Sequence, residues 1–315
     1  MNQLQKKIIS IVTPCFNEQE NVAEVCRQVK EVFAELPQYD YEHIFIDNAS
    51  KDETVNILRK IADENRHIKV IVNTRNFGPI RSPYHAFLQA QGDAAVFLAA
   101  DMQDPPDLIK DFIKKWEEDY KIVIGVKNKS RENPIMFAVR KLYYNLLKKF
   151  ADVEQIKNFQ GFGLYDRQLI EILRKMEDPY PYFRGLVSET GFTRAEIEYT
   201  QTERKKGKSH NNFYDLYDMA MLGFVNHSKV PLRLASFIGF GMSAISFIIG
   251  LIYLALKLLF WRYFEWGLAP LIVGIFFLGA VQLFFIGVLG EYIGAIYTQI
   301  KRRPLVIEKE RINFK

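Results

Sequence analysis

Residues 8–18 read IISIVTPCFNE, an apolar, β-rich run that meets a proline and continues into polar residues. Similar runs follow at Tyr41–Asp47, Ile68–Asn73, Ala94–Ala100 and Ile122–Val126. Amphipathic stretches alternate with them and predict helices over Glu20–Leu36, Asp52–Asn65, Pro83–Gln91 and Pro106–Glu118. This alternation predicts an α/β domain with a mostly parallel sheet covered by helices.

Polar clusters follow four of the predicted strands, where ligands bind in parallel sheets. Glu18 and Asp47 could accept hydrogen bonds from a ribose and a base, and Asp101 with Gln103 offers oxygen ligands for Mg²⁺ or Mn²⁺. Each residue alone could equally form a turn or cap a helix, but four successive clusters favour binding. The sequence contains neither G-x-G-x-x-G nor a P-loop, so a nucleotide would be held in another way.

Two uncharged apolar stretches, Leu234–Leu256 and Trp266–Gly290, follow the predicted domain. Each has the roughly 20 residues that a helix needs to cross a bilayer core of about 30 Å. We therefore predict two transmembrane helices at about 232–258 and 266–292, the alternative being a helical hairpin buried in a soluble protein. Small residues in both stretches suit helix packing in lipid and make a homo-oligomer plausible.

Lysine and arginine lie mainly outside the two stretches, on the sides nearer the chain termini. The positive-inside rule then predicts an integral protein of the cell (inner) membrane, with the α/β domain and both termini cytoplasmic. No signal peptide is expected, because the apolar run after Lys7 ends at Pro14. A hydrophobic content of 49% excludes a disordered chain, two cysteines exclude a disulfide scaffold, and a net charge of +5 predicts no nucleic-acid partner.

Seven motifs appear in a fixed order along the chain: TPCFNEQENV (13–22), IDNASKDET (46–54), NTRNFG (73–78), GDAAVFLAADMQDPPDLI (92–109), YFRGLV (182–187), RKKGKSHNNF (204–213) and LGEYIGAIYTQIKRRP (289–304). In these motifs the chain resembles the polyisoprenyl-phosphate glycosyltransferases of glycosyltransferase family 2. This family includes dolichol-phosphate mannose synthase and bacterial undecaprenyl-phosphate glucosyltransferases. The resemblance implies a GT-A (Rossmann-like) fold, a nucleotide-sugar donor, a polyprenyl (undecaprenyl) phosphate acceptor in the membrane, and inversion at the anomeric carbon.

The resemblance also implies roles for individual residues. The donor would be held by a set of strand-end residues: Pro14, Phe16, Glu18, Asp47, Asn48, Ser50, Arg75 and Asp101. Asp101 and Gln103 match the second Asp and the Gln of the family's D-x-D-x-Q metal motif, which implies Mg²⁺ or Mn²⁺. The acceptor phosphate would meet a set of basic and hydroxyl residues: Arg131, Arg204, Lys206, Lys208 and Ser209. Asp101, Arg204 and Lys208 are the predicted catalytic residues.

Three positions depart from the family pattern. Ala99 replaces the first Asp of D-x-D, Gly161 replaces an acidic residue, and His210 stands where Lys commonly follows the Ser of the basic loop. Because a phosphate nucleophile is largely dianionic at pH 7, it needs no strong general base, and the loss at Gly161 is tolerable.

The resulting prediction is an inverting hexosyltransferase, with UDP-glucose as the first choice of donor. One alternative is a degenerate nucleotide-sugar-binding membrane scaffold, which Ala99 and Gly161 favour. Another is a processive polysaccharide synthase, whose Q-x-x-R-W motif is absent. We expect a cytoplasmic catalytic domain over 1–203, a basic loop and interfacial amphipathic helix over 204–230, the two spans over 231–300, and a cytoplasmic tail over 301–315.

Overall fold

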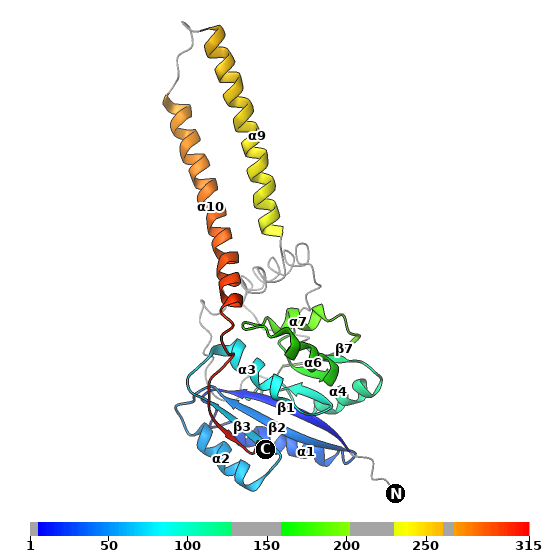
Figure 1. Cartoon of the computed structure of the whole chain (residues 1–315). Helices are drawn as coiled ribbons and strands as arrows, with labels where there is room; N and C mark the ends of the chain where they lie inside the picture. Colours follow the sequence, from blue (N-terminus) through cyan, green and yellow to red (C-terminus); the bar gives the residue numbers. More distant parts are fainter. Residues whose placement is uncertain (1–5, 128–158, 202–229, 261–267, 315) are drawn as a thin grey trace.

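The computed structural model describes residues 6–127, 159–201, 230–260 and 268–314 (Figure 1). Its strands are β1 (Lys7–Cys15), β2 (Tyr39–Asp47), β3 (Ile68–Asn73), β4 (Ala94–Phe97), β5 (Ile122–Lys127), β6 (Gly163–Asp166), β7 (Arg194–Tyr199) and β8 (Glu308–Ile312). Its helices are α1 (Val22–Ala34), α2 (Thr54–Glu64), α3 (Gly78–Gln89), α4 (Leu108–Glu117), α6 (Arg167–Met176), α7 (Phe183–Glu189), α9 (Val230–Leu259) and α10 (Leu268–Ile300).

The strands form one eight-stranded mixed sheet in the order β7-β5-β6-β4-β1-β2-β3-β8. Strands β1 to β4 are parallel to their neighbours within this group, and β5 is parallel to β7. Since β6 is antiparallel to both β4 and β5, the β5–β7 pair points the same way as β1 to β4. The carboxyl ends of six strands therefore meet along one edge of the sheet, which we call the carboxyl edge.

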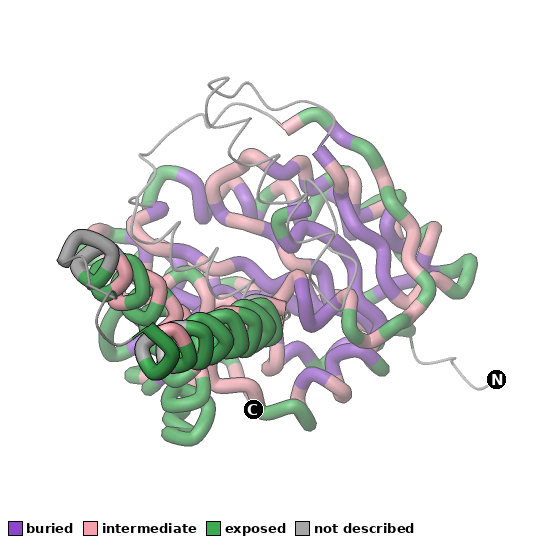
Figure 2. The backbone as a smooth tube through the Cα atoms, turned by 90° about the horizontal axis from the view of Figure 1, so that it is seen from above, coloured by how far each residue is buried: buried purple, intermediate pink, exposed green. Residues whose placement is uncertain are grey.

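Both faces of the sheet are buried under helices. Successive side chains in a strand point to opposite faces, so neighbouring residues contact different helices. Ile11 packs with residues of α1, α2 and α4 on one face, and Val12 packs with residues of α3, α6 and α7 on the other. Figure 2 shows the buried positions concentrated in this domain, whereas α9 and α10 are largely exposed. The predicted α/β class is confirmed.

Several element boundaries differ from the sequence prediction. Helix α3 begins at Gly78 rather than at Pro83, because Pro79 occupies its first turn, where a missing N–H costs little. Strand β4 ends at Phe97 instead of Ala100. Strands β6 and β7 lie beyond the last strand that we predicted, and they widen the sheet on the β4 side.

The segment after α10 belongs to the sheet. Strand β8 pairs antiparallel with β3, and Thr74 N donates to Ile307 O over 3.0 Å. Asn313 Nδ2 donates to the carbonyls of Ala62 and Ile68 at 2.7 and 2.9 Å. The segment that we expect to be a cytoplasmic tail, 301–315, thus contributes the edge strand β8 to the sheet.

Helices α9 and α10 project away from the sheet domain as a pair (Figure 1). The segments Leu232–Ile252 and Gly274–Ile300 are long and apolar enough to cross a membrane, and none of either is buried within the protein. Large apolar side chains such as Phe240 and Phe276 are each 75% exposed. These features agree with the two predicted spans.

Candidate active site

The carboxyl edge gathers the predicted donor residues from separate parts of the sequence. Cys15 at the end of β1 is paired in register with Asp47 at the end of β2, and β3 ends next to β2 at Asn73. The turn that holds Asp101 and Gln103 follows β4, which pairs with the other side of β1. The structure thus brings together the strand ends that carry Pro14, Phe16, Glu18, Asp47, Asn48, Ser50, Arg75, Asp101 and Gln103.

The loops after β1 and β2 are joined by reciprocal hydrogen bonds between side chains and backbone. Asn17 N donates to Ser50 Oγ over 2.8 Å, and Lys51 N donates back to Asn17 Oδ1 over 2.8 Å. Further along, Glu18 N donates to Thr54 Oγ1 over 2.9 Å. The predicted donor residue Ser50 also donates its hydroxyl to Asp47, so one side chain connects both loops.

Two carboxylates lie buried beneath these loops. Asp47 has no exposed surface, Glu18 is 8% exposed, and Glu18 Oε2 accepts from Asn21 Nδ2 over 2.6 Å. Burial raises the pKa of Asp47, although hydrogen bonds from Ser50 oppose this shift. Burial and the charges of Asp47, Glu18 and Asp52 raise the pKa of the Cys15 thiol well above its usual value. Both carboxylates of the predicted pair therefore act electrostatically on the same buried residue, Cys15.

Asn48 serves as a connector between β2 and the turn before α3. Its Nδ2 donates to Asn76 Oδ1 at 2.9 Å and to Gly78 O at 3.2 Å. Its Oδ1 accepts from Phe77 N at 2.9 Å and from Asn73 Nδ2 at 3.2 Å. These four bonds use the full capacity of an asparagine amide, so Asn48 is placed to position the loop rather than to contact a ligand.

Among the described residues of the carboxyl edge, three other than glycine have a positive φ. They are Asn17 (54°) after β1, Ala49 (62°) after β2 and Met102 (59°) after β4. Such conformations cost of order 1–3 kcal/mol each and cluster at functional sites. Of the three residue types, only asparagine commonly adopts this backbone conformation, so the positive φ of Ala49 and Met102 could not be predicted from their identity.

The turn after β4 places two oxygen-bearing side chains together. Gln103 N donates to Asp101 Oδ1 over 3.2 Å, which closes a tight turn around Met102. Both side chains are half-buried. The next residue, Asp104, is 7% exposed and accepts a hydrogen bond from the hydroxyl of Tyr199 at the end of β7.

Sequence reasoning did not single out Asp104, Lys127 or Tyr199. Burial raises the pKa of Asp104, while Tyr199 and the positive charge of Lys127 oppose the shift. Lys127 ends β5 and donates its Nζ to Gln160 Oε1. The alternating sequence RAEIEY could have indicated β7, but nothing local connects Tyr199 with Asp104.

Asp101 and Gln103 fit a divalent metal ion of the kind held partly by substrate. No cluster of three His, Cys, Asp or Glu side chains that could hold a metal occurs among the described residues. Mg²⁺ commonly takes one or two protein oxygens and completes its shell with water and substrate phosphates. The one carboxylate and one amide at this turn suit such shared coordination, and Ala99 removes a further carboxylate.

The predicted acceptor residues Arg131, Arg204, Lys206, Lys208 and Ser209 lie outside the described residues. In the sequence, these residues come shortly after Lys127 and Tyr199, which end β5 and β7 at the carboxyl edge. Gly161 is described and has φ = 106°, with its carbonyl accepting from Tyr165 Oη over 2.6 Å. A side chain at this position would be strained by the backbone, whatever the space around it.

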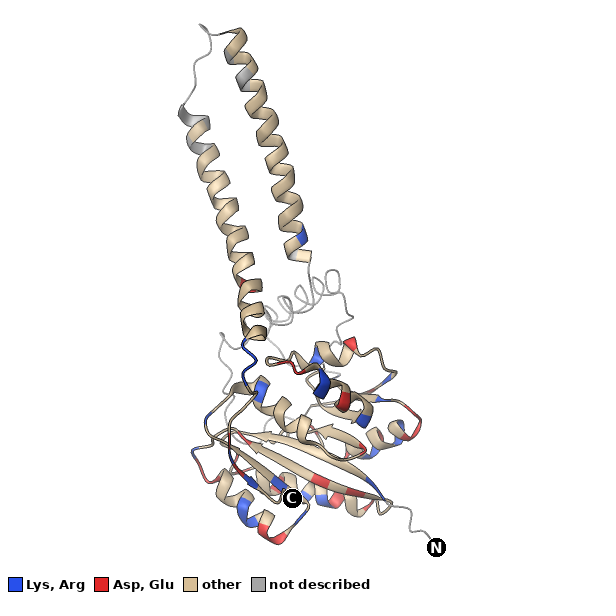
Figure 3. Cartoon of the chain, viewed as in Figure 1, with Lys and Arg blue, Asp and Glu red and all other residues tan. Residues whose placement is uncertain are grey.

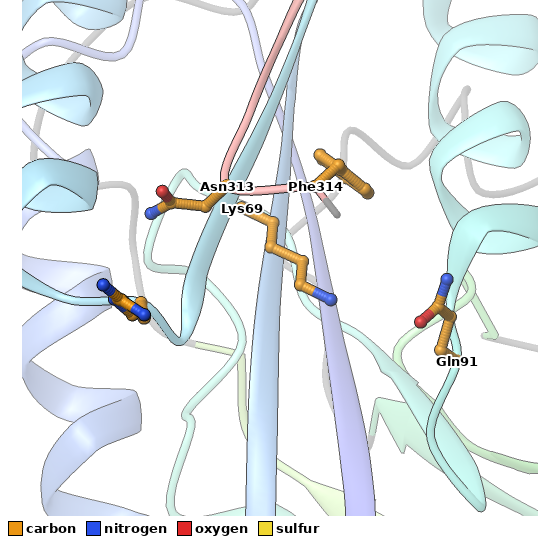
Figure 4. Close-up of a pocket in the computed structure, with 5 residues that line it drawn as sticks. Lys69, Gln91, Asn313 and Phe314 are labelled. Atoms are coloured by element: carbon orange, nitrogen blue, oxygen red, sulfur yellow. The ribbon is translucent and has the colours of Figure 1, made fainter.

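A pocket at the other end of the sheet does not belong to this site. It is lined by Arg66, Lys69, Gln91, Asn313 and Phe314 (Figure 4). Lys69 lies at the start of β3, and its Nζ contacts Glu42 Oε2 at 2.6 Å. Its charge is therefore already balanced within the protein.

Comparison with known proteins defines the family. Residues 10–173 match the model named Glycosyl transferase family 2, and this segment contains most of the carboxyl edge. The chain belongs to this family, and the mixed sheet agrees with the GT-A fold that the resemblance implied.

Relatives match almost the full chain, including both apolar helices. An uncharacterized glycosyltransferase of Bacillus subtilis, YkcC, is 35% identical over 95% of this chain and 92% of its own length. The SfII prophage-derived bactoprenol glucosyl transferase of Shigella flexneri is 33% identical over 96% of this chain and 97% of its own. Among solved structures, a Pyrobaculum calidifontis mannosyltransferase in complex with GDP-Man and Mn²⁺ has a TM-score of 0.47, with 18% identity over 70% of this chain and 63% of that chain.

Proposed function

We propose that this protein transfers a hexose, with glucose from UDP-glucose as the first choice, to a polyprenyl phosphate at the cytoplasmic face of the membrane. The observation that carries the proposal is the near-complete match to a bactoprenol glucosyl transferase, which extends from the carboxyl edge through both apolar helices. A soluble acceptor would not require that pair of exposed apolar helices.

The carboxyl edge supplies a preformed donor site. The side chains of Asn21 and Ser50 donate hydrogen bonds to Glu18 and Asp47, and the cross-linked loops fix the backbone around this pair. We infer that Asp47 and Glu18 recognise the nucleoside, with Pro14, Phe16 and Arg75 lining its surroundings and Ser50 and Asn48 positioning the loops. The pair does not by itself separate uridine from guanosine.

The acceptor brings its own nucleophile. A phosphate monoester with a second pKa near 6 is largely dianionic at pH 7, so one of its oxygens can attack the anomeric carbon without a general base. The carbon–oxygen bond to the donor diphosphate breaks as the new bond forms on the opposite face, and the configuration inverts. Arg131, Arg204, Lys206, Lys208 and Ser209 would offset the charge of the acceptor phosphate.

Asp101 and Gln103 would hold Mg²⁺ or Mn²⁺, which when bound stabilises the charge on the departing nucleoside diphosphate. Asp104 and Tyr199 keep the Asp101–Gln103 turn attached to β7. The protein would act as an integral membrane enzyme with both termini cytoplasmic, and we expect a homo-oligomer because of the small residues in its spans.

A binding protein without transfer activity is the second candidate. Ala99 and Gly161 favour it, because both positions lack an acidic residue of the family pattern. The backbone at Gly161 has a φ of 106°, a conformation that favours glycine. The local fold therefore accounts for a glycine at this position.

The test is transfer of radiolabel from a panel of nucleotide sugars to undecaprenyl phosphate by the full chain in detergent, with Mg²⁺, Mn²⁺ or EDTA. Asp101→Asn should lower transfer by about 100-fold or more, as loss of a transition-state charge contact does. Asp107→Asn is the matched control, since Asp107 precedes α4 in the same loop and pairs only with Lys110 at 3.3 Å among the described residues. Donor binding without label in lipid from any donor would favour the binding protein.

A further inference from the structure

Three guanidinium groups from separate parts of the chain come together beside the end of α10. Arg75 follows β3, Arg81 lies in α3, and Arg303 follows α10. The Cζ atoms of Arg75 and Arg81 lie 4.0 and 5.5 Å from the centroid of the same ring, that of Phe77. Arg81 Nη2 donates to the carbonyl of Pro304, the residue after Arg303, so this part of the chain passes beside Arg81. Burial lowers the pKa of Arg81, and the charges of Arg75 and Arg303 lower it further.

These three charges are not balanced within the described part of the chain. None of the three forms a salt bridge there, whereas Arg27, Arg59 and Arg311 of the same domain all pair with carboxylates. Arg75 Nη1 donates to Asn76 O over 3.0 Å, and Arg81 Nη2 donates to Pro304 O. Both acceptors are neutral carbonyls, and buried Arg81 Nε has no hydrogen-bond partner among the described residues. Such a cluster favours a bound anion.

The cluster lies where the sheet domain meets the apolar helices. Exposed Lys301, Arg302 and Arg303 follow directly on α10. Figure 3 shows a blue, basic stretch of the chain at the base of α10. Gln299 Nε2 near the end of α10 donates to Asp178 Oδ1 over 3.0 Å, which adds a second link between helix and domain.

We propose that Arg75, Arg81 and Arg303 form a binding site for the phosphate group of a membrane lipid. This inference rests on the proposed placement of α9 and α10 across the membrane, which would put the cluster at the bilayer surface. Arginine suits the role because its planar fork makes paired hydrogen bonds to phosphate oxygens. The phosphate could belong to an anionic phospholipid headgroup or to a polyprenyl phosphate, and either would hold the carboxyl edge near the bilayer.

This site consists of residues other than those predicted to bind the acceptor phosphate at 131 and 204–209. It includes Arg75, which we also expect near the donor, so donor binding must be measured alongside lipid binding. Arg81 and Arg303 carry no other predicted role and are therefore the residues to change.

The experiment measures lipid retention by the full chain with native mass spectrometry in detergent, without any donor. Phosphatidylglycerol, undecaprenyl phosphate and phosphatidylcholine are titrated against the wild type and Arg81→Gln/Arg303→Gln. A basic residue near an anionic membrane contributes about 1 kcal/mol, so the apparent Kd should weaken about fivefold per arginine for one or both anionic lipids. The lipid that shows the larger loss identifies the source of the phosphate.

The matched control is Arg27→Gln/Arg66→Gln, which removes the same charge from exposed positions on α1 and after α2. Its lipid retention should equal that of the wild type, and thermal melting checks that both double variants fold. Unchanged anionic-lipid affinity in Arg81→Gln/Arg303→Gln would overturn the proposal. So would a loss of UDP affinity in that variant with lipid affinity intact, because the arginines would then serve the donor. Because the experiment measures lipid binding and not transfer, it can support the lipid site even if the protein proves to lack transferase activity.

Discussion

The hydroxyl of Tyr199 donates a hydrogen bond to the buried carboxylate of Asp104. Asp104 directly follows the Asp101–Gln103 turn, and Tyr199 ends β7 shortly before the basic loop that begins at Arg204. One bond thus connects the proposed metal turn with the strand that leads to the proposed acceptor loop. We interpret both residues as positioning residues that fix the spacing of the two phosphate sites.

Tyr199→Phe should lower transfer about tenfold, since loss of a partner that orients a metal site typically costs 10–100-fold. The ring remains packed against Phe162, with which it makes an edge contact at 5.5 Å between centroids, so folding should persist. The measurement is kcat and KM for donor and acceptor as a function of Mg²⁺ concentration. We expect a higher Mg²⁺ requirement, and Asp104→Asn, which can still accept the bond, should lose less than Asp104→Ala. An equal loss in all three variants at every Mg²⁺ concentration would contradict a positioning role.

Asn48→Ala should destabilise the sheet domain by about 2–4 kcal/mol, because it leaves buried Phe77 N and its other partners unpaired. The readout is thermal melting of the full chain in detergent, together with the donor KM, which should rise as the turn before α3 loosens. Asn56→Ala, at an exposed position of α2, is the control and should change stability by less than about 0.5 kcal/mol. Similar melting of the two variants would show that the four bonds of Asn48 contribute little.

Acid should destabilise the domain through His43. Burial lowers the pKa of His43 to about 3, and its Nε2 lies 2.9 Å from Thr13 Oγ1. The unfolded chain takes up this proton near pH 6.5 and the folded chain does not, so stability is complete above about pH 6.5 and falls as the pH decreases below it. Melting of the wild type should therefore fall more steeply between pH 7 and 5 than melting of His43→Gln. If the melting temperatures of the wild type and His43→Gln decline in parallel, His43 is not the cause of the acid sensitivity. As a control, His67→Gln, which changes an exposed histidine, should show the same pH dependence as the wild type.

Gly161→Asp, which installs the acidic residue of the family pattern, should not increase transfer. At φ = 106° it should cost about 1–3 kcal/mol of stability, although the nearest atom to a Cβ, Phe97 Cδ1, is an acceptable 3.6 Å away. Ala99→Asp, whose backbone φ is negative, is the comparison: it should fold normally and test the missing metal contact by itself. Melting temperature and transfer rate are measured for both variants. A Gly161→Asp variant that folds normally and transfers hexose faster than the wild type would contradict this prediction.

The parallel core of the sheet was predictable because each of its strands is an apolar run that ends in a polar cluster. Strand β8 was not predictable, since EKERI is polar and follows an apolar helix, so only its pairing with β3 identifies it as a strand. The candidate site also combines residues that local sequence can predict with residues that it cannot. Glu18, Asp47, Asp101 and Gln103 could be predicted to lie at one edge because strand ends converge in parallel sheets. The Tyr199–Asp104 bond and the arginine cluster join positions distant in sequence that only tertiary packing brings together.

The central claim is transfer of a single hexose to a polyprenyl phosphate. The most direct measurement is mass spectrometry of the lipid extract after the full chain has reacted with undecaprenyl phosphate and UDP-glucose. We predict one new species, undecaprenyl phosphate carrying one hexose, which forms with the wild type and Asp107→Asn and is strongly reduced with Asp101→Asn. A ladder of products with several hexoses, or bound donor with no new lipid from any nucleotide sugar, would contradict the account.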